Sequence, residues 1–333
     1  MNVNSCLALL VAAASLTAQA SADFKISSSR ATKTATAKNA KYVKQWTLKA
    51  GAKTNVIDSI DLSLAGNAYV SYMKDLPGDV LGYVNVSGDS REVVDAVTVS
   101  KDVSNELTND LGNMLDIDTN GGELNVVLAN RAASGYLLTE IFLGDPETVQ
   151  ELKSQRSAQV VVEEGVLVTD SDRAKVEIDA TGSSAVFVSD EDAAVSVKLL
   201  SFETTGKGSI EYSVGSIAAS KVEMNAEGSS SIAVLSSTVK TTKLDLEVNP
   251  ESSGEICFSA TKVKATTREI EGESSISMPN AVKKHGTTGT EECKASPLPP
   301  REAGKVTATA PSLVNTLFDN DDSDLDDDEN DLA

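Results

Sequence analysis

An apolar pattern that returns about every 22 residues is the feature of this sequence that most constrains its fold. Successive anchor residues of the pattern are separated by 24, 22, 24 and 20 positions: Val186, Ile210, Ile232, Ile256 and Ile276. A second large apolar residue follows two positions after each anchor: Val188, Tyr212, Val234, Phe258 and Met278. A repeat of this length is typical of a solenoid, in which each unit buries its apolar face only against its neighbours.

Within each repeat, apolar and polar residues alternate, which indicates short β-strands with one buried face. In the segment VEMNA, Val222, Met224 and Ala226 point to one side, and Glu223 and Asn225 point to the other. We therefore predict an all-β fold, a single right-handed parallel β-solenoid with about 22 residues and three short strands per coil. Equivalent residues of successive coils would stack about 4.8 Å apart. A β-sandwich with serine-rich turns is the alternative, because evenly spaced short strands occur in both folds.

The template extends beyond the clearest repeats. It fits IDLSLAGNAYVSY (residues 60–72) and, with a one-residue slip, LDIDTNGGELNVVL (residues 115–128). Glycine stands four positions before most anchors, where a corner between strands needs dihedrals that other residues resist, and nearby serines can bond the exposed backbone. Residues 46–282 are thus predicted to form the solenoid.

The segments outside the repeats have compositions of their own. Residues 1–22 are predicted to be a secretory signal peptide, because an apolar run precedes a small-x-small cleavage signature at residues 20–22. Residues 23–45 resemble a flexible basic linker rich in Ser, Thr, Ala and Lys, and residues 319–333 form an acidic tail. The Pro-rich segment of residues 283–318 lies between the solenoid and the acidic tail. Its run from Lys294 to Ser312 is expected to be extended and solvated.

The apolar run of the signal peptide is too short to cross a bilayer. The C-terminus also lacks the apolar tail of a lipid-anchored precursor. We therefore expect a secreted, extracellular protein without a membrane span or a lipid anchor.

Two cysteines remain after removal of the signal peptide, Cys257 and Cys293. An even number of cysteines in an oxidising compartment favours a disulfide, which would tether the Pro-rich segment. Cys257 follows the anchor Ile256, so its side chain should face outward. Two free thiols or half of a metal site is the alternative, although His285 is the sole histidine and is expected in an exposed loop.

Charge and motifs exclude several classes of function. The formal net charge of −21 repels phosphate backbones, so we expect no nucleic acid partner. No Ser-His-Asp order, Walker loop or G-x-S-x-G motif is present, and we expect neither catalytic, metal nor cofactor-binding residues. Four outward acids fall in comparable columns: Asp179, Glu203, Glu223 and Glu247. They could form an acidic stripe, but a solvated strand face is the simpler interpretation. Asn85 begins the one N-glycosylation sequon.

The order of elements over residues 46–280 resembles the auto-transporter adhesin head domain of GIN type. The resemblance rests on IDLSLAGNAYVSY, YVNVSGD, LDIDTNGGEL, LTEIFLGDPETVQELKSQRSAQVVV and the glycine-serine coils that follow. It implies a parallel β-solenoid with a surface or adhesive role. It assigns no residue-specific function.

These observations predict a secreted, non-catalytic binding or adhesion protein. Its repetitive polar surface would contact an extracellular polymer, a glycan or a surface protein through many weak contacts. A polysaccharide-active β-solenoid enzyme, which would need clustered carboxylates in a groove, is one alternative. A secreted effector that binds a host protein is another.

Overall fold

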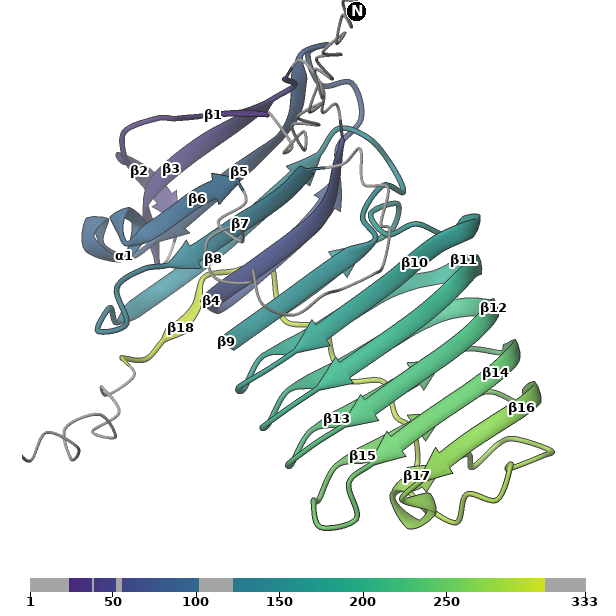
Figure 1. The fold of residues 1–333 in the computed structure, drawn as a ribbon. Helices are drawn as coiled ribbons and strands as arrows, with labels where there is room; N and C mark the ends of the chain where they lie inside the picture. The colour runs from purple at the N-terminus through teal and green to yellow at the C-terminus, as the bar shows by residue number, and fades with distance from the viewer. Residues whose placement is uncertain (1–23, 38, 52–55, 102–121, 309–333) are drawn as a thin grey trace, which may run out of the picture.

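The computed structural model describes residues 24–37, 39–51, 56–101 and 122–308. The predicted signal peptide and acidic tail lie outside the described residues. Nearly all described elements are strands, and they form a β-solenoid of about five turns (Figure 1). The predicted fold class is therefore confirmed.

Parallel pairing joins the strands of the solenoid from β4 to the C-terminal end (Figure 1). These strands are β4 (Ile57–Tyr72), β9 (Glu151–Glu163), β10 (Asp170–Ala180), β11 (Ala185–Thr204), β12 (Ser209–Ala226), β13 (Ser231–Leu235), β14 (Thr238–Val248), β15 (Glu255–Phe258), β16 (Lys262–Glu271) and β17 (Ile276–Ser277). The predicted anchors lie in register, since Ile210 pairs with both Val186 and Ile232, and Ile256 pairs with both Ile232 and Ile276.

Each coil has three sides, and the register of β12 shows where they meet. Residues 209–214 pair with one segment of the coil before them, residues 216–219 with a second, and residues 221–226 with a third. We call the sides that contain these three segments face 1, face 2 and face 3. Three short strands per coil, as predicted, therefore enclose a narrow core.

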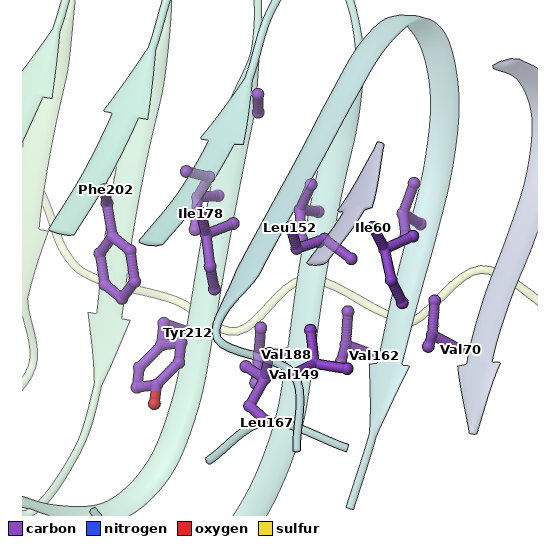
Figure 2. Close-up of a cluster of buried hydrophobic side chains, with 14 of the residues drawn as sticks. Ile60, Val70, Val149, Leu152, Val162, Leu167, Ile178, Val188, Phe202 and Tyr212 are labelled. Carbon is purple, nitrogen blue, oxygen red and sulfur yellow. The ribbon is translucent and has the colours of Figure 1, made fainter. Parts of the chain in front are cut away.

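Stacked columns of apolar side chains fill that core. On face 3, Ile60, Leu152, Ile178 and Phe202 follow one another from coil to coil (Figure 2). On face 1 the corresponding column contains Val70, Val162, Val188 and Tyr212 (Figure 2). All eight side chains are at most 4% exposed, and the rings of Phe202 and Tyr212 meet across the interior with their centroids 4.9 Å apart.

The corner between face 3 and face 1 contains the predicted glycine column. Gly206 and Gly228 have φ angles of 73° and 82°, in the left-handed region that side chains with a Cβ resist. A Cβ on Gly228 would also lie 2.8 Å from the carbonyl oxygen of Gly206 on the coil before it. The glycines thus allow the chain to turn while successive corners remain in van der Waals contact.

The N-terminal third of the fold departs from the prediction. Residues 25–49, expected to be a flexible linker and the first part of the solenoid, form three strands: β1 (Lys25–Ser28), β2 (Thr32–Ala37) and β3 (Ala40–Lys49). β3 pairs antiparallel with β5 (Val80–Gly88), and β5 pairs antiparallel with β8 (Gly135–Leu143). β6 (Val97–Lys101) is also antiparallel, to β7 (Gly122–Leu128), and the short helix α1 (Arg91–Asp95) precedes β6.

This antiparallel sheet closes the first end of the solenoid. β8 and β7 pair in parallel with two successive parts of β4, whose other edge carries β9. The upstream match of the template is therefore correct for β4 and for residues 122–128 in β7, whereas residues 115–121 lie outside the described residues. An antiparallel cap satisfies the strand edge that the first coil would otherwise expose.

Residues 273–289 close the other end. They include the 3-10 helix η1 (Glu273–Ser275), the short strand β17 and a turn that inserts His285. His285 is only 5% exposed, and its Nε2 donates a hydrogen bond to the carbonyl of Val263 on β16 at 2.9 Å. The expectation of an exposed loop histidine was wrong, because the ring satisfies a backbone group at the free edge of the last full coil.

Candidate binding surfaces

Face 1 is covered by the C-terminal segment of the chain. Residues 291–306, which we call the strap, run along one outward column of face 1 from the last coil to the first (Figure 1). The column contains Ser277, Cys257, Ala233, Glu211, Phe187, Val161 and Tyr69. The predicted solvated Pro-rich segment is therefore packed against the solenoid as far as residue 306.

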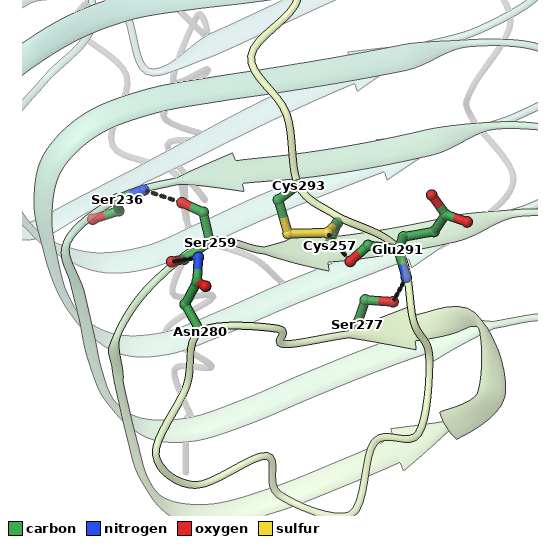
Figure 3. Close-up of a disulfide and its surroundings, with 7 residues drawn as sticks. All are labelled: Ser236, Cys257, Ser259, Ser277, Asn280, Glu291 and Cys293. Atoms are coloured by element: carbon green, nitrogen blue, oxygen red, sulfur yellow. Dashed lines mark hydrogen bonds between the residues drawn. A yellow bond between two sulfur atoms is a disulfide. The ribbon is translucent and has the colours of Figure 1, made fainter.

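A disulfide attaches the strap to the last coils. Cys257 and Cys293 are bonded, with their Cα atoms 5.4 Å apart (Figure 3). Nearby, the backbone N–H of Glu291 donates to Ser277 Oγ at 2.9 Å (Figure 3). The outward direction predicted for Cys257 and its pairing with Cys293 are both observed.

Hydrogen bonds hold the strap along its length. The N–H of Ser296 donates to Glu211 Oε2 at 2.9 Å. Farther along, the hydroxyl of Tyr69 donates to the carbonyl of Pro299. The side-chain amide of Asn67 donates to the carbonyls of Pro300 and Glu302 at 3.1 and 3.0 Å. Polar groups of the solenoid thus replace the water that an extended backbone would otherwise bind.

Arg301 anchors the far end of the strap on β4, β8 and β9. Its guanidinium bonds Glu140 at 2.8 Å and Glu163 at 3.0 Å, and it lies 4.8 Å from the centroid of the Tyr69 ring. The strap then forms β18 (Gly304–Val306), which pairs antiparallel with β8. Tyr69, Leu138 and Val161 form a small apolar cluster under this end, with Ala303 packed against it.

Face 3 carries two columns of acids. One column stacks Asp179, Glu203, Asn225, Glu247 and Glu271 on successive coils. The other stacks Glu177, Ser201, Glu223, Asp245 and Glu269. Of the acids predicted to share a stripe, three lie in the first column, and Glu223 lies in the second.

Two lysines neutralise part of face 3. Lys221 Nζ lies 2.5 Å from Glu223 and 3.4 Å from Asp245. Lys243, one coil later, lies 3.2 Å from Asp245 and 2.8 Å from Glu269. Acids and lysines therefore alternate in a continuous ladder of ion pairs across three coils, which supports reading this part of the face as a solvated surface.

Asp179 is the most perturbed carboxyl of the acidic columns. Partial burial raises its pKa to about 6, and the stacked carboxylate of Glu203 adds to the increase, while Lys153 opposes it. A carboxyl with such a pKa beside a second carboxyl could exchange a proton with a bound molecule near neutral pH.

Face 2 differs from face 3 in its charge. Its central outward column passes from Ser196 and Ala218 to Lys240 and Lys264, and the adjacent column ends in Lys262. Asp170 precedes Ser196 in this column, so the side chains pass from an acid through small residues to lysines at the C-terminal end.

The remaining predicted residues have simple positions. Asn85 lies on β5, half-exposed, and its Oδ1 accepts a hydrogen bond from Gln45 Nε2 at 2.9 Å. Within the described ranges, no group of three or more histidine, cysteine or acidic side chains is arranged to hold a metal ion. Sequence reasoning missed the anchors of the strap, Asn67, Tyr69 and Arg301, because their partners lie between 138 and 235 positions away.

Across the described residues, these features define a capped β-solenoid with a strap on one face and two polar faces that no described segment covers. No family model matches the chain, and no curated protein matches it. A similar solved structure is that of a Parabacteroides distasonis protein described as a "putative lipid binding protein". It is 14% identical, the match covers 69% of this chain and 95% of that chain, and the TM-score is 0.33. Across the described part of the chain, no helix has both the length and the apolar character needed to cross a membrane.

Proposed function

We propose that this protein is a secreted, non-catalytic binding or adhesion protein that contacts extracellular polymers, glycans or partner surfaces through faces 2 and 3. The observation that carries the proposal is the in-register stacking of outward polar residues on these two faces. Equivalent side chains recur about every 4.8 Å along the solenoid, so an extended partner can meet the same chemistry several times. Repeated weak contacts then add through effective concentration.

The covalent and packing features support the same proposal. A disulfide is typical of proteins from oxidising compartments, and it holds the strap over face 1. Because the strap occupies face 1 and both ends are capped, faces 2 and 3 are the sides that the described residues leave open. The resemblance to the GIN-type adhesin head agrees with this role and forms part of the proposal.

Binding measurements test the proposal directly. Purified protein should bind immobilised wall polysaccharides or surface proteins weakly as a monomer and more strongly when clustered on a multivalent support. Equal binding by the monomeric and clustered forms, or no binding to any of these surfaces, would contradict it.

A polysaccharide-active enzyme is the second candidate, and the raised pKa of Asp179 beside Glu203 favours it. A carboxyl with a raised pKa beside a second carboxyl is the arrangement that glycoside hydrolysis requires. A reducing-sugar assay on the same polymers separates the two functions. Release of sugar ends that Asp179→Asn abolishes would establish the enzyme.

A further inference from the structure

The basic end of face 2 contains lysines without acidic partners. Lys240 and Lys264 are exposed and stack in register on β14 and β16, and Lys262 lies two residues before Lys264 on the same face. Lys283, from the segment that closes the solenoid, lies beside the first two. Among the described residues, none of these four lysines forms an ion pair with an acid.

The lysines of face 3 provide an internal comparison. Lys221 and Lys243 also stack in register on successive coils, but acids lie within 3.4 Å of each ammonium group. Like charges on directly paired strand positions repel each other unless an opposite charge lies between them. The chain supplies that opposite charge on face 3. On face 2, an anion from outside the chain would have the same effect.

Three of the unpaired lysines, Lys240, Lys264 and Lys283, line a hollow that can admit a ligand. Its volume is about 310 Å³, and Thr241, Thr266 and His285 also contribute to its lining. Ammonium groups beside threonines match a ligand that carries both anionic and hydroxyl groups.

His285 forms part of the lining of this hollow. Its Nε2 donates to Val263, which leaves Nδ1 as the nitrogen that could accept a hydrogen bond when the ring is neutral. Nδ1 is buried and has no hydrogen-bond partner within the described part of the chain. A buried polar atom without a partner is rare.

We infer that this hollow on face 2 binds an acidic glycan, with Lys240, Lys264 and Lys283 contacting its carboxylate or sulfate groups. This inference rests on the proposed function and specifies its ligand class. Face 3, with its acidic columns, lies around the next corner of the same coils. A carbohydrate chain is narrow enough to contact the lysines of face 2 without approaching those acids. Duplex nucleic acid or a flat anionic membrane would bring phosphates toward those acids as well.

The experiment compares three polymers on the full chain. We expect polygalacturonate, which has carboxylates, or dextran sulfate to bind more tightly than neutral dextran, and the affinity to fall as NaCl is raised. The double variant Lys240→Glu, Lys264→Glu should weaken binding to the acidic polymer by about tenfold or more. Lys207→Glu is the matched control, since Lys207 is exposed at a corner away from the hollow and should change the affinity by less than about twofold.

The outcomes distinguish this inference from the proposed function. Equal loss of affinity per reversed charge in the double variant and in the Lys207 control would mean that net charge alone governs binding, and it would overturn the assigned site. Binding of neutral dextran as tightly as the acidic polymers would overturn the ligand class and leave the proposed binding function intact. Stronger binding to vesicles of phosphatidylglycerol than to either acidic polymer would also overturn it. Thermal unfolding of each variant shows whether the solenoid remains folded.

Discussion

Removing the disulfide should destabilise the protein mainly through its unfolded state. In the variant Cys257→Ser, Cys293→Ser, the unfolded chain regains the freedom of a loop whose ends are 36 positions apart. The chain-entropy relation gives about 4 kcal/mol for a loop of this length at 25 °C. For a domain of this size, that loss corresponds to a decrease in Tm of about 8 to 15 °C.

The native structure should change little in the same variant. Arg301, the hydrogen bonds from Asn67 and Tyr69, and β18 still hold the far end of the strap. Far-ultraviolet circular dichroism should therefore match that of the unaltered protein. Urea unfolding, followed by circular dichroism, measures the change in free energy.

Wild-type protein with its disulfide reduced is the control, because it lacks the same covalent link without any change of sequence. Its free energy of unfolding should agree with that of the double variant. A loss of less than about 1 kcal/mol in the double variant would refute the reasoning. It would mean that the unfolded chain gains little freedom, or that the two cysteines are not linked in the purified protein.

Three further perturbations test the core, a corner and the acidic face. Ile232→Asp buries a carboxylate without a partner at a position that is 1% exposed, and it should lower the free energy of unfolding by on the order of 5 kcal/mol. The adjacent, exposed Ser231→Asp should lower it by less than about 1 kcal/mol, and similar urea midpoints for the two variants would show that the inward assignment is wrong. Gly66→Ala places a Cβ 2.5 Å from a backbone oxygen at a φ of 83°, and it should lower the free energy of unfolding by about 1 to 3 kcal/mol. Gly78→Ala, where a Cβ meets open space, should change it little, and equal Tm values for the two variants would show that the Gly66 corner does not require glycine. Because Asp179 keeps its proton to about pH 6 when folded and releases it near pH 3.8 when unfolded, stability contributed by this group is lost as the pH rises from about 4 to 6. Asp179→Asn should flatten urea midpoints across that window, and an unchanged pH dependence would remove Asp179 as its source.

The solenoid could be predicted from the sequence because its signal is periodic. Inward positions such as Ile210 and Ile232 must be apolar in every coil, so the period of the pattern equals the length of the coil. The outward direction of Cys257 follows from its place one residue after Ile256, and the even number of cysteines then indicated Cys293 as its partner. Three sides per coil also followed from the spacing of short alternating segments.

Other parts of the fold depend on contacts that no local pattern records. Residues 25–49 are mostly polar and lysine-rich, yet β3 is ordered because β5 offers a strand edge and because Trp46 and Leu48 enter the core. The edge of a strand bonds backbone groups, so the pairing itself leaves no pattern in the side chains.

The strap is the clearest case. Its prolines cannot continue a ladder and its apolar residues show no period, so in isolation it resembles a solvated linker. Asn67 and Tyr69 satisfy its carbonyls, and Glu140 and Glu163 hold Arg301, only after the coils have stacked and placed these side chains along face 1. The repeat pattern therefore determines which residues enter the core, whereas the assembled surface decides which face the strap covers and which faces remain open for binding.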